Sequence, residues 1–293
     1  MSLAAASLAF LDGMSRCAKE RYRVQLLDEA SGETLAVASP YASYYADPFL
    51  LVARGERWLF VEEFHCPSNR AHISAMRVGE NLRVGEAVLA LDPGCHTSFP
   101  FVFEHDGAVY LLPETSQARS VDLYVCEGLP DRWRLAQRLL SGVDCADSVL
   151  LLHGGVWYLV TSQADEGAKQ RRALAIYWSE TLLSGHWTPH PVNRRRLYAD
   201  RPHGYGRNAG AIVRAGDDLL RPMQASTRYY GEAASLMRID ALTPERYAEA
   251  PYAGEHATAR IAALRSTHHV SAAGGLVAWD TRTHTGWFTR DRT

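Results

Sequence analysis

Apolar runs recur along the chain in pairs, and a turn glycine separates the two runs of each pair. Three stretches show this pattern: ADPFLLVARGERWLFVEE from Ala46, SFPFVFEHDGAVYLLPET from Ser98 and ADSVLLLHGGVWYLVTS from Ala146. Apolar runs of about four to eight residues on either side of a glycine turn are typical of buried β-hairpins. The pattern therefore predicts three related hairpins in the first half of the chain.

A residue that we call the anchor opens each hairpin, eight residues before the turn glycine. Asp47, Phe99 and Asp147 are the first three anchors, and Asn208 and Thr267 fit the same interval in two later copies. Successive anchors lie 52, 48, 61 and 59 residues apart, which fills the chain. Repeats of this length indicate propeller blades. We therefore predict an all-β fold, a five-bladed β-propeller with about four strands per blade.

A third apolar run follows three of the hairpins and supports the repeat independently. It begins at Leu123, Ile176 and Leu236; a leucine follows six residues later, and an aromatic residue follows after ten or eleven. This pattern predicts a third strand, a turn, and an aromatic side chain on the outer strand of each blade.

The segment Tyr22 to Asp28 alternates like a strand and stands well before the first hairpin. In closed propellers a strand from one terminus often completes the blade built by the other, which removes an exposed sheet edge. We expect this strand to complete the last blade. The predicted organisation is an N-terminal arm over residues 1–21 and a single propeller domain over residues 22–293.

Charge and cysteine content indicate which partners and which cellular location to expect. The net charge of −2 gives no electrostatic reason to expect nucleic acid or an anionic membrane, and two short basic runs, Lys169–Arg172 and Arg194–Arg196, are interpreted as solvated loops. The N-terminal apolar stretch lacks a preceding basic residue and is too short to span a bilayer. The five cysteines are scattered without a CxxC pair, which favours a reducing compartment and no structural zinc. We expect a cytoplasmic protein without a transmembrane segment.

The innermost strands of a propeller line its central channel, so the anchors predict a site on the axis. Asp47 and Asp147 occupy equivalent positions in blades one and three and are expected to face each other across a pocket. Paired carboxyl groups suit glycoside chemistry. In the alternative interpretation, each aspartate caps the entry to its strand by bonding to the backbone that follows.

Other polar residues fall near the same end of the blades. Glu62, Glu63 and Glu114 end second strands, and Gln224 has a similar place in blade four. A salt bridge to an arginine such as Arg201 or Arg207 would explain these carboxylates equally well.

Histidines also lie close to two anchors. His96 precedes the second anchor, and His268 and His269 follow the fifth. They are candidates for binding sugar hydroxyls or a metal, or for a structural role. Because the chain has no HExxH motif, we expect no metal and no cofactor.

Several enzyme classes lack their motifs in this chain. There is no GxSxG elbow, no P-loop and no GxGxxG after a strand. No two aspartates are separated by one residue, so the Asp-x-Asp metal motif of many nucleotide-sugar transferases is missing too.

The hairpins and their flanks resemble a known family. ADPFL at Ala46, SFPFVFEHDGAVYLLPETS at Ser98, VDCADSVLLLHGGVWYLVTS at Val143 and SGHWTPHPVN at Ser184 are similar to one propeller domain. That domain precedes the transferase module of plant glucosamine inositolphosphorylceramide transferases and also occurs in bacterial polysaccharide-biosynthesis proteins. RNAGAIV at Arg207 and STRYYGEAASLMRI at Ser226 extend the resemblance to about residues 46–280. We expect no counterpart of the transferase module in this sequence.

The domain is more distantly similar to the five-bladed furanosidase superfamily, which includes glycoside hydrolase family 43. This resemblance implies that Asp47 is the base and that Asp147 tunes pKa values. It fails at the blade-four glutamate acid, where this chain has Arg207-Asn208-Ala209-Gly210. Either Glu114 or Glu232 supplies the proton, or the protein does not hydrolyse glycosides in that way.

The leading hypothesis is a carbohydrate-active enzyme that acts on a glycosidic bond by hydrolysis, phosphorolysis or transfer. Asp47 is the expected base or nucleophile, Asp147 the orienting carboxylate and Glu114 the acid. The expected substrate-binding residues are His96, Arg207, Asn208, Gln224 and His268. The expected partner is a carbohydrate or glycolipid substrate.

Two non-catalytic alternatives remain open. The first is a sugar-binding or scaffold propeller that presents a glycan or lipid-linked intermediate to a separate glycosyltransferase. The second is a protein-interaction propeller with an inert axis, which would have a dry or salt-bridged centre.

Overall fold

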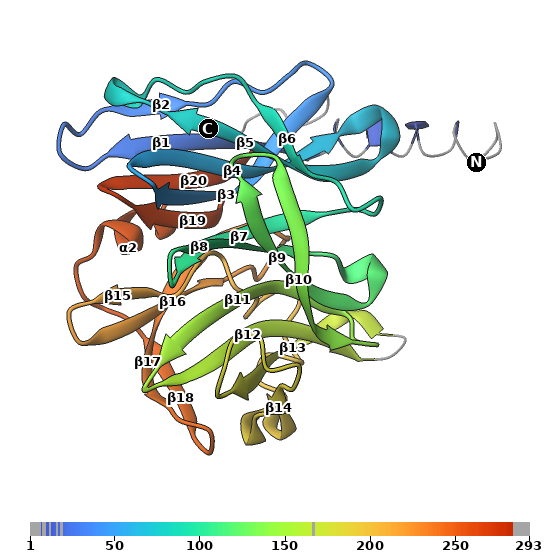
Figure 1. Cartoon of the computed structure of the whole chain (residues 1–293), viewed down its shortest axis with the longest axis vertical. Helices are drawn as coiled ribbons and strands as arrows, with labels where there is room; N and C mark the ends of the chain where they lie inside the picture. The colour runs from blue at the N-terminus through green and yellow to red at the C-terminus, as the bar shows by residue number, and fades with distance from the viewer. Residues whose placement is uncertain are drawn as a thin grey trace.

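The strands form five four-stranded antiparallel sheets arranged in a ring, a five-bladed β-propeller (Figure 1). The computed structural model describes residues 20–165 and 168–283, together with residues 7, 10–11, 13–15 and 17. The predicted fold class and the number of blades are confirmed. Most of the predicted N-terminal arm and the last predicted residues of the domain, 284–293, lie outside the described residues.

Each of the first four blades is a meander of consecutive strands. Blade one has β3 (Ser43–Ala53), β4 (Glu56–His65), β5 (Arg70–Val78) and β6 (Val88–Leu91), and blade two has β7 (Ser98–His105), β8 (Ala108–Glu114), β9 (Ser120–Gly128) and β10 (Arg132–Ser141). Blade three has β11 (Cys145–His153), β12 (Val156–Asp165), β13 (Ala168–Ser179) and β14 (Thr188–Pro189), and blade four has β15 (Val213–Ala215), β16 (Asp218–Gln224), β17 (Ala234–Leu242) and β18 (Tyr247–Pro251). Short 3-10 helices occupy Cys66–Ser68 (η1), Glu80–Leu82 (η2), Ser116–Ala118 (η3) and Pro191–Arg195 (η4).

Blade five joins the two ends of the chain. Its strand order is β19 (Thr267–Ala273), β20 (Leu276–Thr283), β1 (Arg21–Asp28) and β2 (Thr34–Ala36), and helix α2 (Ala257–Ala262) precedes β19. In Figure 1 the blue N-terminal strands lie beside the red C-terminal ones. β1 pairs with β20 along its whole length, from Arg21 opposite Thr283 to Asp28 opposite Leu276. The predicted closure of the last blade by the N-terminal strand is therefore confirmed.

The anchors of the first three hairpins share an unusual backbone conformation. Asp47, Phe99 and Asp147 have φ values of 50°, 46° and 52°, and each lies at a shift in register between the first two strands of its blade. A β-bulge re-aims a side chain and bends its strand. Because a non-glycine residue at positive φ costs of order 1–3 kcal/mol, such strain persists only where the surrounding structure enforces it. The repeated anchor is thus a repeated bulge.

Blades four and five depart from this register. Asn208 lies before the short strand β15 and forms only an isolated bridge with Met223. In blade five the register shift falls between Thr267 and His269. His268 is therefore the bulged residue, and the Thr267 hydroxyl instead donates to the carbonyl of Ile261.

Apolar clusters fill the gaps between the blades. The largest joins blades one to four. A second packs β1 against blade one, and a third packs blade four against blade five. At that last junction Gly210 has a φ of 144°, and a Cβ there would lie 1.9 Å from the carbonyl oxygen of Val270. Only glycine allows the backbones of these two blades to approach so closely.

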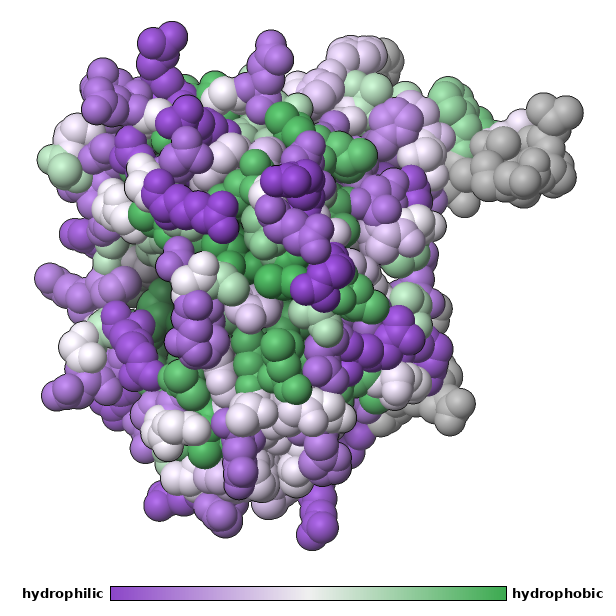
Figure 2. All heavy atoms as spheres, in the orientation of Figure 1, coloured by the Kyte–Doolittle hydropathy of each residue, from purple (hydrophilic) through white to green (hydrophobic). Residues whose placement is uncertain are grey.

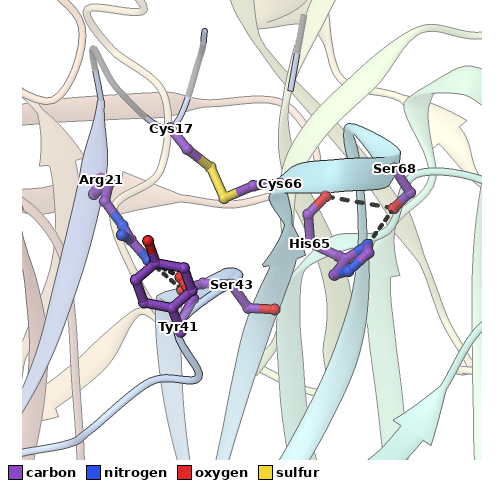
Figure 3. Close-up of a disulfide and its surroundings, with 7 residues drawn as sticks. All are labelled: Cys17, Arg21, Tyr41, Ser43, His65, Cys66 and Ser68. Atoms are coloured by element: carbon purple, nitrogen blue, oxygen red, sulfur yellow. Dashed lines mark hydrogen bonds between the residues drawn. A yellow bond between two sulfur atoms is a disulfide. The ribbon is translucent and has the colours of Figure 1, made fainter. Parts of the chain in front are cut away.

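A disulfide between Cys17 and Cys66 links the N-terminal arm to blade one (Figure 3). Nearby, Arg21 donates to the carbonyl of Ser43, so β1 is tied to the same region. The sequence did not predict this pair, because the two cysteines are 49 residues apart. Disulfides are rare in reducing compartments. The expectation of a cytoplasmic location loses the support of the cysteine pattern and stays a prediction.

We expect loss of this disulfide to lower the free energy of unfolding by about 2–4 kcal/mol, because the crosslink restricts the unfolded chain. Urea unfolding of oxidised wild type and of Cys17→Ser measures the difference. Cys126→Ser, at a free and half-buried cysteine, is the control. Equal stability of wild type with and without reducing agent would contradict the expectation.

Part of the molecular surface is hydrophobic. Figure 2 shows hydrophobic surface in the middle of one face of the molecule, with hydrophilic residues around it. The large exposed apolar side chains include Val52 and Leu152, each close to the end of a first strand.

None of the helices in the described ranges is long and apolar enough to cross a membrane.

Candidate site at the centre of the propeller

A cavity of about 320 Å³ lies where the first strands of the blades begin. Residues of blades one, two and five surround it, together with two residues from the blade-four region. They are Tyr22, Tyr44, Ala46, Asp47, Glu62, His96, Ser98, Glu114, Arg207, Tyr230 and His268. Five of the eight predicted site residues therefore line one pocket, which we call the central pocket.

Asp47 lies in the wall of the central pocket beside His268. Its Oδ1 is 3.4 Å from Nδ1 of His268 and has no hydrogen-bond partner among the described residues. Its backbone N–H donates to Oδ2 of Asp280 at 2.9 Å. Burial raises the pKa of Asp47 well above its ordinary value, although the nearby His268 opposes this shift.

Asp280, in the second strand of blade five, orients His268. Its Oδ2 lies 3.2 Å from Nδ1 of His268. Burial disfavours the charged imidazole, but Tyr230, Asp280 and Asp47 outweigh burial, and the pKa of His268 is raised. Burial likewise disfavours the Asp280 carboxylate, but His268 lowers its pKa overall. The two residues therefore form a buried ion pair.

The other nitrogen of His268 faces blade four. Nε2 lies 2.8 Å from the hydroxyl of Tyr230 and 3.3 Å from Nε2 of Gln224. Gln224 does not line the central pocket but lies behind the imidazole. Its Oε1 has no partner among the described residues, so rotation of the amide would give a protonated His268 an acceptor.

Glu114 also lines the central pocket, and it shares the guanidinium of Arg207 with Asp147. Arg207 donates to both carboxylate oxygens of Asp147 and lies 3.5 Å from Oε2 of Glu114. Glu114 also accepts from the backbone N–H of Asp147 at 3.0 Å. Burial and the charge of Asp147 raise the pKa of Glu114 despite Arg207. A carboxyl group with a raised pKa is suited to donate a proton.

Asp147 and Asn208 have positions that the sequence did not predict. Asp147 is paired with Arg207, and only 3% of its side chain is exposed, so it does not face Asp47 across an open pocket. The amide of Asn208 is wholly buried and donates to the carbonyls of Asp147 and Val160. Its oxygen accepts from Arg221. The blade-four position that holds an acid in the furanosidase superfamily is thus part of a buried structural network.

The other candidate carboxylates lie in different surroundings, and one of them lines the central pocket. Glu62 lines the central pocket, 3.8 Å from Nε2 of His96. Glu63 instead accepts from Ser74 on the neighbouring strand. Glu232 is bonded to the backbone N–H groups of residues 227 and 228, which lower its pKa to about 2. Such a group stays ionised, so Glu232 is unsuited to be the acid.

The sequence did not predict Asp280 or the tyrosines of the central pocket as site residues. Asp280 pairs with His269, at the position where blade one pairs Phe60 with Phe49. An aspartate in place of a core phenylalanine was the available signal. Tyr22 was placed in the closing strand, but nothing in the sequence showed that its ring reaches the axis.

Asp47, His268 and Asp280 also form a possible cation site, because one ligand atom from each lies within 4.8 Å of the others. A histidine must be neutral to bind a metal. The raised pKa of His268 favours the protonated form instead. The absence of a metal therefore stays our prediction.

We expect the stability difference between wild type and His268→Gln to depend on pH. The pKa of His268 is raised above its ordinary 6.5, so its stabilising contribution is complete below about pH 6.5 and is lost as the pH rises through the folded-state pKa. The lowered pKa of Asp280 keeps its carboxylate ionised in the same range. Urea unfolding at several pH values measures the difference. A difference that does not change with pH would contradict the ion pair.

The sequence matches the family described as "Glucosamine inositolphosphorylceramide transferase 1, N-terminal" over residues 31–266. Glucosamine inositolphosphorylceramide transferase 1 of Oryza sativa subsp. japonica is 30% identical over 212 residues, which are 72% of this chain and 28% of that protein. The chain thus spans less than a third of the length of this relative.

Among solved structures, a family 117 glycoside hydrolase of Zobellia galactanivorans aligns with a TM-score of 0.54 at 9% identity, over 94% of this chain and 93% of its own. A GH32 β-fructofuranosidase of Bombyx mori aligns with a TM-score of 0.54 at 12% identity, over 74% of this chain and 53% of its own. At these identities the two likenesses show the fold alone.

Proposed function

Because this chain belongs to the family of glucosamine inositolphosphorylceramide transferase 1 N-terminal domains, we propose that its central pocket binds a sugar of a glycan or glycolipid and acts on a glycosidic bond. The observation that carries the proposal is the convergence of three carboxyl groups, Asp47, Glu62 and Glu114, on one cavity. Glycosidic bonds are cleaved and formed between such groups.

The size and lining of the central pocket fit a sugar. Its volume of about 320 Å³ is near the lower end of the roughly 300–1,000 Å³ typical of small-molecule sites. Tyr22, Tyr44 and Tyr230 are among its lining residues, and a tyrosine side chain combines an apolar ring with a polar hydroxyl. A sugar ring presents C–H groups and hydroxyls that match both.

The proposed roles follow from the contacts. Glu114 is the acid, because the pKa of its carboxyl group is raised. Asp47 is the base or nucleophile once its proton has passed to solvent, because the neighbouring His268 is already protonated in its ion pair with Asp280. Asp147 does not line the central pocket, and its role is to hold Arg207 in place by two hydrogen bonds. Hydrolysis, phosphorolysis and glycosyl transfer all use this set of groups.

A second candidate function is non-catalytic: the protein binds a sugar and works with a separate glycosyltransferase. Two observations favour it. Asn208 is part of a buried network where the furanosidases have their acid, and only 7% of the Asp47 side chain is exposed. In this function the carboxylates would bind hydroxyls without transferring protons.

Incubation of the purified chain with a panel of glycosides, polysaccharides and glycolipids separates the two functions. Sugar release or transfer is measured by chromatography, and binding by calorimetry. Turnover supports the first function, whereas binding without turnover supports the second. Neither binding nor turnover across the panel would contradict both.

A further inference from the structure

A second hollow, of about 690 Å³, adjoins the central pocket and shares Arg207 and Tyr230 with it. Its other lining residues are Arg172 of β13 and residues 199–205, which belong to the connection between η4 and β15. We call this hollow the annex. It is larger than the central pocket, and none of its lining residues was part of the predicted site except Arg207.

The annex is basic where the central pocket is acidic. Three guanidinium groups line it, from Arg172, Arg201 and Arg207, with Asp200 as the single carboxylate among its lining residues. The central pocket has three carboxyl groups and one guanidinium. A ligand that occupies both hollows would therefore place a polar, uncharged or cationic part in the centre and an anionic part in the annex.

The three arginines differ in how far their charge is already neutralised. Arg172, which was interpreted from sequence as part of a solvated loop, forms an ion pair with Asp144 at 2.7 Å. Arg207 is paired with Asp147, but its Nη1 makes no hydrogen bond to a described residue. Arg201 makes no ion pair with any described residue, and its guanidinium lies 5.5 Å from the ring centre of Tyr205. Arg201 and Arg207 therefore retain donors for an anion.

We propose that the annex binds the phosphate group of a phosphorylated glycan or glycolipid whose sugar occupies the central pocket. This inference rests on the proposed function of the central pocket. Arginine presents a planar fork of donors that matches phosphate oxygens, and charge-assisted bonds of this kind are strong. Arg207 stands at the boundary, where its Nη2 lies against Asp147 and Glu114 and its Nη1 is left for the phosphate.

Two kinds of ligand carry a phosphate group that fits this position. One is the phosphodiester of an inositol phospholipid headgroup, and the other is the diphosphate of a nucleotide sugar. Calorimetric titration of the full chain with myo-inositol 1-phosphate and with uridine diphosphate compares them, and neutral myo-inositol serves as the reference ligand. The tighter of the two phosphate ligands identifies the source.

We expect Arg201→Gln to weaken binding of the preferred phosphate ligand about 10- to 100-fold, because a bond to a charged group is lost, and to leave binding of neutral sugars unchanged. Arg201 is exposed and forms no ion pair with a described residue, so the variant should fold like wild type. Arg54→Gln is the matched control, since this exposed arginine lies in the turn after β3, at the other end of that strand from Asp47.

The outcomes distinguish the annex from the central pocket. If neutral sugars bind in an Asp47-dependent way but neither phosphate ligand binds more tightly than myo-inositol, the annex inference is wrong and the proposed function stands. The annex inference is also wrong if Arg201→Gln and Arg54→Gln bind phosphate ligands equally. If phosphate ligands depend on Arg201 while no sugar depends on Asp47, the proposed function fails instead.

Discussion

Replacing Asp47 with asparagine should lower the turnover of a glycoside substrate by about 10²- to 10⁴-fold, the usual contribution of a positioned acid or base. The substitution removes the ionisable group but keeps the size of the side chain. It also keeps the backbone, because asparagine tolerates the positive φ of 50° that Asp47 adopts. The fall should therefore reflect lost proton transfer rather than lost folding.

Asp106→Asn is a closely matched control. Asp106 also has a positive φ, 49°, but it lies in the exposed turn between β7 and β8, far along the strand from the anchor Phe99. Steady-state kinetics on the best substrate of the panel, with melting curves of both variants, completes the comparison. If Asp47→Asn turns over substrate as fast as Asp106→Asn, the assignment of Asp47 as base or nucleophile is wrong.

Replacing Arg221 with methionine should lower the free energy of unfolding by about 3–5 kcal/mol, the cost of leaving a buried charge without its partner. Arg221 is wholly buried and donates to both oxygens of Glu249 at 2.8 Å. It also donates to Asn208. Without the guanidinium, the hydroxyls of Tyr198 and Tyr247 are the donors that remain to Glu249 among the residues that the structure describes.

Urea unfolding at neutral pH measures this loss. Arg238→Met is the control in the same blade, because Arg238 forms an exposed pair with Asp240, and exposed pairs contribute about 0–1 kcal/mol. The double variant Arg221→Met/Glu249→Gln should recover part of the stability, since it removes the unpaired charge. A loss for Arg221→Met no larger than that for Arg238→Met would show that this network is not what fixes blade four.

The blade count and the location of the central pocket followed from local sequence signals. The fixed interval between anchor and turn glycine reflects a bulge that three hairpins repeat, and a bulge at the start of a first strand directs its residue to the axis. Asp47 was therefore found by register alone. Asp147 has the same backbone, but the sequence could not show that Arg207, 60 residues later, would bind its carboxylate.

The missed features depend on contacts between distant segments. These features are the Cys17–Cys66 disulfide, the pairing of Asp280 with His268, and the annex. Each joins segments whose separation in the sequence does not recur from blade to blade. Blade four was the least well predicted. Its first strand, β15, has only three residues, and the side chain of its anchor Asn208 forms buried hydrogen bonds while its backbone makes only an isolated β-bridge.

A crystal structure with the best ligand of the panel would show whether the middle of the propeller is a sugar site. We expect a sugar ring in the cavity between Asp47 and Glu114, with its hydroxyls within hydrogen-bond distance, about 2.6–3.2 Å, of their carboxyl oxygens. A ligand bound only on the outer rim, with the cavity between these two residues free of sugar, would contradict it.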